Sequence, residues 1–252
     1  MQWWQAGLIA LAGVWAGLIN AVVGSGTLVT FPVLVALGYP PVTATTSNAI
    51  GLITGSITGA VGYRSELTGH GRRLVGYGVA SFLGAICGTV LLLSLPADAF
   101  ETIVPVLVGL SVVLVLVQPV LSRRLKTRAA VDRSSSPLLY VLVFLVGVYG
   151  GYFTAAQGIM LIGVMGLLLA DPLQRLNAFK NTLTAVVNVV AGAIYAVVAP
   201  VSWPVVAILA VSSIAGGLLG ASVGKRLSPT VLRGAIVVIG VAAVVHLLVD
   251  RV

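Results

Sequence analysis

The sequence predicts an all-α polytopic membrane protein built from two inverted-topology repeats. Of its 252 residues, 59% are hydrophobic and only 8% are charged, and the mean hydropathy is +1.13. A soluble domain has about 25% charged residues. Two long apolar regions, 5–37 and 138–170, are each interrupted by small residues that form helices poorly. The composition therefore places nearly all of the chain in a bilayer, and the paired interruptions indicate that one unit occurs twice.

The first long apolar region, 5–37, exceeds the roughly 20 residues that one membrane-spanning helix needs. It is interrupted at Gly24-Ser25-Gly26, and Asn20 precedes this break. Every backbone N–H and C=O must be paired in lipid, so a helix that breaks at membrane depth has to be buried in protein or line a polar cavity. We therefore predict a V-shaped hairpin here, consisting of a helix, a turn and a returning helix.

Three simple spans follow this hairpin. Apolar stretches of sufficient length occupy 42–62, 74–96 and 102–121. The next segment, 122–137, is rich in Arg and Ser, and we interpret it as a basic cytoplasmic linker. The first repeat is thus predicted to cover residues 1–121.

The second half repeats this order. The region 138–170 is interrupted by Ala155-Ala156-Gln157-Gly158, and we predict a second V-shaped hairpin around this break. The second repeat is predicted to cover residues 138–252. Its three simple spans are expected at 178–199, 205–223 and 232–249.

The two halves are related by matching residues. Gly24 and Gly158 occupy the two breaks and lie 134 positions apart. Each unit has one hairpin and three spans, an odd number of crossings, so the second unit must be inserted upside down. Inverted repeats with paired broken helices are typical of secondary transporters, whose substrate site lies at the midplane where the breaks meet. Further matches are Gly13/Gly17 with Gly147/Gly151 and, at an offset of 132, Gly84/Gly88 with Gly216/Gly220; we interpret the last two pairs, which have GxxxG spacing, as helix-packing seams.

The positive charges predict the orientation of the chain. If each hairpin returns to the side from which it entered, 13 of the 14 Lys and Arg residues fall on the cytoplasmic side and only Arg251 falls outside. Both termini are then extracytoplasmic, in the plasma membrane. Topology accounts for the net charge of +8, so we expect no nucleic-acid partner. The 13 residues are Arg64, Arg72, Arg73, Arg123, Arg124, Lys126, Arg128, Arg133, Arg175, Lys180, Lys225, Arg226 and Arg233.

Polar side chains near the two breaks indicate a site for a small anion. Helix N-termini beside a break present N–H groups and the positive end of a dipole, and no Asp or Glu lies inside a predicted span. The alternative is that these side chains only bond one helix to another, and that Lys180 extends to the cytoplasmic surface. The candidate substrate-binding residues are Asn20, Gly24, Ser25, Gly26, Ser47, Asn48, Gln157, Gly158, Lys180, Asn181 and Asn188.

Chemistry other than transport has little support in the sequence. There is no Ser/His/Asp pattern, no metal-ligand spacing and no phosphate-binding loop. The single Cys87 excludes an internal disulfide and a multi-cysteine metal site. We therefore expect no cofactor, no metal ion and no enzymatic activity.

The chain resembles the TauE/SafE family of sulfite and organosulfonate exporters over essentially its full length. The first half carries GLINAVVGSGTLVTFP at 17–32 and ATTSN at 44–48; the second carries GGYFTAAQGIMLIGVMGLLL at 150–169 and AFKNT at 178–182. The family usually has three glycines at the first break, where this chain has Gly-Ser-Gly, and the second break keeps only Gly158 beside Gln157. The resemblance implies export of sulfite or of a C2 sulfonate such as sulfoacetate or taurine.

Together these features predict a secondary transporter that works by alternating access, with its substrate at the midplane between the breaks. The expected partners are a small anionic substrate and the lipid bilayer, and a homodimer is possible. An alternative is a channel of the same architecture or a carrier for another small anion, such as a carboxylate. An intramembrane enzyme fits the sequence less well because the spans hold no catalytic pair, and a structural subunit fits less well because it would not need polar breaks.

Overall fold

The protein is described by a computed structural model that covers residues 1–127, 133–223, 234, 236–242 and 244–245. Within these residues the chain is helical and contains no β-strand, which confirms the predicted all-α class. The elements are α1 Trp3–Val22, α2 Thr27–Ala36, α3 Pro41–Gly51, α4 Ile53–Gly62, the short η1 Arg64–Leu67, α5 Gly71–Ser94, α6 Ala97–Thr127, α7 Pro137–Phe153, α8 Gln157–Leu168, α9 Leu173–Val198 and α10 Trp203–Val223.

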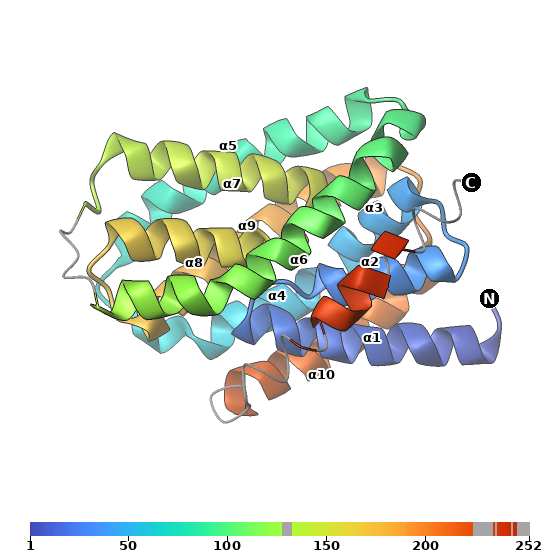
Figure 1. Cartoon of the computed structure of the whole chain (residues 1–252), viewed down its shortest axis with the longest axis horizontal. Helices are drawn as coiled ribbons and strands as arrows, with labels where there is room; N and C mark the ends of the chain where they lie inside the picture. The colour runs from blue at the N-terminus through green and yellow to red at the C-terminus, as the bar shows by residue number, and fades with distance from the viewer. Residues whose placement is uncertain (128–132, 224–233, 235, 243, 246–252) are drawn as a thin grey trace.

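Five helices of the described part are long and apolar enough to cross a membrane. The helices lie side by side along the long axis of the molecule (Figure 1), with α5 and α7 along one edge, α1 along the opposite edge and α6 running obliquely across the view. The protein is therefore built as a multi-helix membrane bundle. The five stretches are Trp3–Val22, Gly71–Ser94, Asp98–Val120, Leu173–Val198 and Trp203–Ser222.

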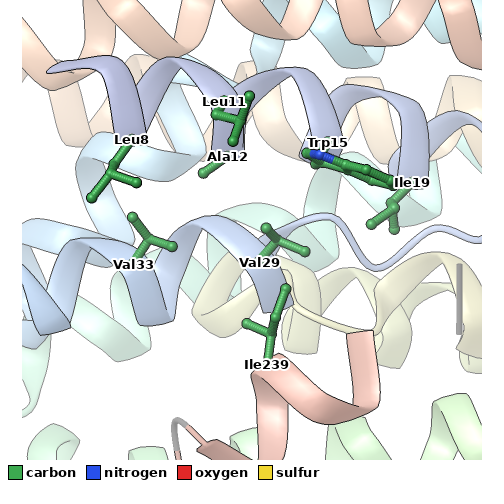
Figure 2. A pocket seen from close by; sticks show the side chains of 8 residues that line it. All are labelled: Leu8, Leu11, Ala12, Trp15, Ile19, Val29, Val33 and Ile239. Atoms are coloured by element: carbon green, nitrogen blue, oxygen red, sulfur yellow. The ribbon is translucent and has the colours of Figure 1, made fainter. Parts of the chain in front are cut away.

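Both interrupted regions contain two helices separated by a short break. α1 ends at Val22 and α2 begins at Thr27, while α7 ends at Phe153 and α8 begins at Gln157. α2 runs back along α1: Val33 lies across from Leu8, and Val29 lies further along, in the direction of Trp15 (Figure 2). α8 likewise packs against α7. Because α2 and α8 are too short to cross a bilayer, each begins inside the protein, and so both breaks lie there.

The predicted span 42–62 is divided in the structure into two consecutive helices, α3 and α4. The backbone departs from helical geometry at Leu52, where ψ is 0°. At this point the Ser213 hydroxyl of α10 donates a hydrogen bond to the Gly51 carbonyl oxygen at 3.3 Å. A side chain that bonds to a helix carbonyl competes with the helix's own ladder. Tertiary packing thus accounts for an interruption that the apolar run conceals.

The third simple span, predicted at 102–121, lies within α6, and the apolar stretch Asp98–Val120 ends next to the predicted boundary. α6 continues through the first basic residues to Thr127, because Leu, Lys and Arg are good helix formers even where the chain is too polar for the bilayer core. Of the predicted last span, 232–249, residues 236–242 are helical. The rest of it lies largely outside the described residues, as do Arg128, Lys225, Arg226, Arg233 and Arg251.

The GxxxG glycines form two seams between helices, as predicted. A Cβ atom at Gly88 of α5 would run into the Val148 carbonyl oxygen of α7, and one at Gly216 of α10 would run into the Val14 carbonyl oxygen of α1. The same holds for Gly84 against α7 and Gly220 against α1. These backbones can approach so closely only because the side chains are absent.

An ion cluster joins two connections at one end of the bundle. Asp171, which precedes α9, lies 2.7 Å from Nη1 of Arg175 and 3.2 Å from Nη1 of Arg73 at the start of α5. The Asp171 side chain is 6% exposed. The Arg175 Nε also donates to the Glu66 carbonyl oxygen at 3.3 Å. One carboxylate therefore holds segments from both halves of the chain together.

We expect Asp171→Asn to destabilise the protein by about 1–3 kcal/mol, because it removes the carboxylate charge that two neighbouring guanidinium groups contact. The effect is measurable as a lower temperature of thermal unfolding in detergent. Asp98→Asn is the matched control, since Asp98 is exposed at the start of α6 and should change the unfolding temperature little. Equal effects of the two substitutions would contradict a stabilising role for the cluster.

Candidate functional site

The two breaks meet through their backbones. The Gly158 N–H donates a hydrogen bond to the Gly24 carbonyl oxygen at 3.1 Å. Gly24 has a φ of +92°, a conformation that favours glycine. A Cβ atom at Gly24 would lie only 2.6 Å from the Gly158 Cα atom. The equivalent glycines of the two halves are therefore in direct contact, with no side chain between them.

The first break is stabilised by Asn20 and contains a buried serine. Asn20 Oδ1 accepts a hydrogen bond from the Gly26 N–H at 2.7 Å, so this side chain fixes the turn. Ser25 is fully buried, and its hydroxyl has no hydrogen-bond partner within the described chain. A buried polar atom ordinarily has a partner. Ser25 is thus the residue of this break whose side chain is available to a ligand.

The second break carries a buried amide, that of Gln157, which also has no hydrogen-bond partner within the described chain. Gln157 is fully buried, and both its Oε1 and its Nε2 lack a hydrogen-bond partner in the part of the chain that is described. Gln157 lies against Gly150 of α7, where a Cβ atom would be 2.6 Å from Oε1. Ser25 and Gln157 each adjoin one glycine of the Gly24–Gly158 contact, so their unused hydrogen-bonding groups flank the point where the breaks meet.

Lys180 supplies a positive charge beside this contact. It belongs to α9 and is fully buried, so it does not extend to the surface. Its Nζ donates to the Asn20 and Ala21 carbonyl oxygens at 3.0 and 3.1 Å, at the end of α1. The C-terminal end of a helix favours a cation. An ammonium has three N–H donors, so one donor remains beyond the two bonds to α1.

The same face of α9 continues with amide and hydroxyl groups. Asn181 Nδ2 lies 3.4 Å from the Ala21 carbonyl oxygen, and Asn188 Nδ2 donates to the Ser56 hydroxyl of α4 at 2.7 Å. The Asn188 Oδ1 and the Thr184 hydroxyl have no partner among the described residues. Asn181, Thr184 and Asn188 lie at i, i+3 and i+7 of α9, on one helix face, and this polar stripe lies against α1 and α4.

Asn48 and Ser47 take different positions. Asn48 bonds to both hydroxyls at the start of α2: it accepts from Thr30, and its Nδ2 donates to Thr27 at 3.1 Å. Ser47 accepts a hydrogen bond from the Ser202 N–H at 2.9 Å, next to the start of α10. Asn48 therefore supports the first break, whereas the structure ties Ser47 to the α9–α10 connection instead.

Three polar residues near the site were missed in the sequence analysis: Thr27, Thr30 and Ser56. Thr27 and Thr30 lie three positions apart directly after the first break, a spacing that places them on one helix face and could have revealed them. Ser56 gave no such signal. The neighbouring hydroxyls at Thr54 and Thr58 instead bond to backbone carbonyls, of Ala210 and Thr54 respectively.

The expectation of free N–H groups at the helix starts needs correction. Leu28 and Val29 donate to the Ser25 and Gly26 carbonyl oxygens, at 3.1 and 2.9 Å. In α8, the N–H groups of Gln157, Gly158 and Ile159 likewise have carbonyl partners. Tight turns satisfy most of these donors locally, and the Gly158 N–H is satisfied by Gly24 of the other break. The positive character of the site therefore comes mainly from Lys180 rather than from bare backbone amides.

The chemistry of the site suits binding rather than reaction. Lys180 is the charged residue among the buried residues of the described chain, and the other buried polar side chains are neutral. The described residues contain no cluster of three or more His, Cys, Asp or Glu that could hold a metal ion. One ammonium with neutral hydrogen-bonding groups can recognise a small anion.

A separate apolar pocket of about 240 Å³ lies between α1, α2 and the segment that carries Ile239 (Figure 2). Its walls include Leu8, Leu11 and Trp15 of α1, which are exposed, and Val29 and Val33 of α2. This pocket lacks the polar groups found at the breaks. It is therefore not the candidate anion site.

Comparison with known proteins identifies the family. The profile described as "Sulfite exporter TauE/SafE" matches residues 9–247. A probable membrane transporter protein of Haemophilus influenzae is 24% identical over 245 residues, covering 97% of this chain and 94% of the relative. The probable membrane transporter protein YfcA of Escherichia coli is 25% identical over 249 residues, covering 97% and 90%. The chain therefore belongs to the sulfite exporter TauE/SafE family, as a multi-pass membrane transporter and not an enzyme.

Proposed function

We propose that the protein is a secondary transporter that exports a small sulfur-containing anion, which binds near the midplane between the two breaks. The contact between Gly24 and Gly158 carries this proposal, because it brings Lys180 together with Ser25 and Gln157, whose side chains have no partner in the described chain. Paired broken helices that meet inside the membrane are the usual position of a transporter's substrate site.

The proposed architecture is two inverted repeats, 1–121 and 138–252. Its support is a reciprocal pattern of packing. α1 of the first repeat packs along α10 of the second, and α7, the counterpart of α1, packs along α5, the counterpart of α10. A twofold relation between two units requires such an exchange, in which each contact has a symmetric partner. Each repeat then consists of one V-shaped hairpin and three spans, with the span 42–62 divided at Leu52.

In the proposed orientation, both termini lie on the extracytoplasmic side of the plasma membrane. The connections that carry Arg64, Arg73, Arg133 and Arg175 lie at one end of the bundle, opposite the start of α1 (Figure 1). The ion cluster and the bond from the Arg133 N–H to the Leu168 carbonyl oxygen hold them together there. Positive loops favour the cytoplasmic side, so this end is assigned to the cytoplasm.

The proposed mechanism is alternating access, in which one repeat moves against the other around the site. The sequence has no phosphate-binding loop for ATP, so the driving force is a gradient across the membrane. An inside-negative potential assists the exit of an anion by about 2.3 kcal/mol per charge per 100 mV. Sulfite and C2 sulfonates such as sulfoacetate or taurine are the proposed substrates. The alternative, a channel or a carrier for a carboxylate, would show non-saturating flux or preference for carboxylates.

The substrate site is tested with Gln157→Met and Asn181→Ala. Each substitution removes hydrogen-bonding groups, and we expect each to weaken the binding of the sulfur anion by about 10–100-fold, the range for a bond to a charged group. Gln157→Met should not lower the unfolding temperature of the ligand-free protein, since the Gln157 amide has no partner among the described residues. Calorimetry with sulfite, sulfoacetate, taurine and sulfate measures the affinities of the purified protein.

Ser94→Ala is the control for these two variants, because Ser94 is exposed and bonds only to the Val90 carbonyl oxygen of its own helix. It should bind as the wild type does. Unchanged affinity in both Gln157→Met and Asn181→Ala would remove these residues from the site. Preference for carboxylates over all four sulfur compounds would overturn the proposed substrate class.

A further inference from the structure

We propose that the site accepts a single negative charge, so that its substrates are monoanions with a tetrahedral oxygen-bearing head. Hydrogensulfite and sulfonates with an uncharged tail fit this description. Sulfate, the sulfite dianion and sulfoacetate carry two negative charges and are rejected. The inference rests on the proposed function and narrows its substrate class: of the compounds proposed above it keeps sulfite, as hydrogensulfite, and excludes sulfoacetate and taurine.

With Lys180 protonated, the charge at the site is plus one. Lys180 is the charged residue among the buried residues that the structure describes. The other candidate site residues, Ser25, Gln157, Asn181 and Asn188, contribute hydroxyls and amides without a formal charge. The ion cluster of Arg73, Asp171 and Arg175 belongs to the connections at one end of the bundle. A bound monoanion thus neutralises Lys180, whereas a dianion leaves one negative charge uncompensated.

Lys180 has backbone partners in place of an acidic one. Its Nζ bonds to the Asn20 and Ala21 carbonyl oxygens at the end of α1, and these oxygens are the negative end of that helix. They oppose, rather than stabilise, any additional negative charge nearby. A taurine ammonium is also disfavoured, because the described residues offer no buried carboxylate to pair with it.

The helix starts at the two breaks do not replace the missing second cation. A cluster of free backbone N–H groups can hold the charge of a phosphate or sulfate. Here the N–H groups of Leu28, Val29, Gly158 and Ile159 already donate to carbonyl oxygens. The second charge of a dianion would therefore lie in a low-dielectric interior with little compensation. The cost of a lone charge at the centre of a bilayer corresponds to an affinity loss on the order of 100-fold.

Methanesulfonate and sulfate form the first test. Both have a tetrahedral sulfur head of similar size, but methanesulfonate carries one negative charge and sulfate carries two. Calorimetry on the purified wild-type protein at pH 6, where sulfate is still a dianion, should show methanesulfonate binding, with sulfate weaker by on the order of 100-fold. Sulfate binding that is less than about tenfold weaker than that of methanesulfonate would overturn the inference.

Sulfite at two pH values is the second test. Sulfite changes from hydrogensulfite to the dianion as the pH rises through neutrality, whereas methanesulfonate keeps one charge throughout. We expect the apparent affinity for total sulfite to fall between pH 6 and pH 8 by more than the affinity for methanesulfonate. The second ligand controls for titration of the protein, including Lys180; the other titratable side chains near the second break are Tyr149, Tyr152 and Tyr195. A parallel change for both ligands would contradict charge selection.

The two proposals fail in different ways. If sulfate and methanesulfonate bind equally well, the sulfur-anion function stands and the limit of one charge is overturned. If neither methanesulfonate nor sulfite binds at either pH, the proposed sulfur-anion function fails, and the narrower inference fails with it.

Discussion

Gly24→Ala is expected to abolish sulfite transport and to destabilise the protein by about 2–5 kcal/mol. The expected loss of stability has two sources. The φ of +92° at Gly24 costs a residue with a Cβ atom about 1–2 kcal/mol. The new Cβ atom would also lie 2.6 Å from the Gly158 Cα atom, and forcing extra atoms into a packed interior costs about 1–3 kcal/mol. Thermal unfolding and flux into proteoliposomes measure the two losses.

Two further glycine variants separate strain from contact. Gly158→Ala introduces the collision without a positive φ, and should approach Gly24→Ala in its effect on transport. Gly38 already has a φ of +86°, and no atom lies within 4 Å of the Cβ that Gly38→Ala would add. This variant therefore adds backbone strain without a collision, so it should lose only a little stability and keep transport. If Gly24→Ala transports as the wild type does, the direct contact between the breaks is not needed for function.

Lys180→Met is expected to lose about 100-fold or more in anion affinity while the protein remains folded. The substitution removes the buried ammonium and fills its place with an unbranched apolar chain. Loss of the two bonds to the end of α1 is offset by removal of a buried charge, so the net change in stability should be small. Calorimetry with methanesulfonate measures the affinity, and circular dichroism reports the fold.

Two further substitutions of basic residues complete the Lys180 experiment. Arg64→Gln removes a charge from an exposed position, and should leave anion binding unchanged if the effect at Lys180 is local. Lys180→Arg keeps the charge in a larger, planar group that the fully buried position cannot hold in the same geometry, so its affinity should fall between those of wild type and Lys180→Met. Wild-type affinity in Lys180→Met would exclude the ammonium from the site. If Lys180→Met does not fold, the affinity of Lys180→Arg decides the question.

The sequence was most informative where local chemistry governs the fold. Long apolar runs identify membrane helices, and small residues within them mark the places where those helices stop. Their repetition predicts that the two breaks meet, and Gly24 and Gly158 are in contact. The glycine seams were predictable for the same reason, because close helix packing requires the absence of a side chain.

Other features depend on partners far away in the chain. The interruption at Leu52 accompanies a hydrogen bond from Ser213, and Ser47 is directed away from the breaks by its bond to Ser202. Neither partner can be deduced from local pattern. The position of Lys180 was equally open, since a lysine near a helix start can reach the surface or turn inward. Only the packing of α9 against the end of α1 decides it.

The pairing of α1 with α10 also constrains how the protein is made. The glycine seam joins the first helix to one that begins at Trp203, so α1 waits for its partner while nearly 200 residues are synthesised. At 5–20 residues per second this delay is about 10–40 s. During that time the small-residue face of α1 is left to lipid or to assembly factors, whereas α5 obtains α7 much sooner. Biogenesis of the first hairpin is therefore expected to finish last, although its sequence leaves the ribosome first.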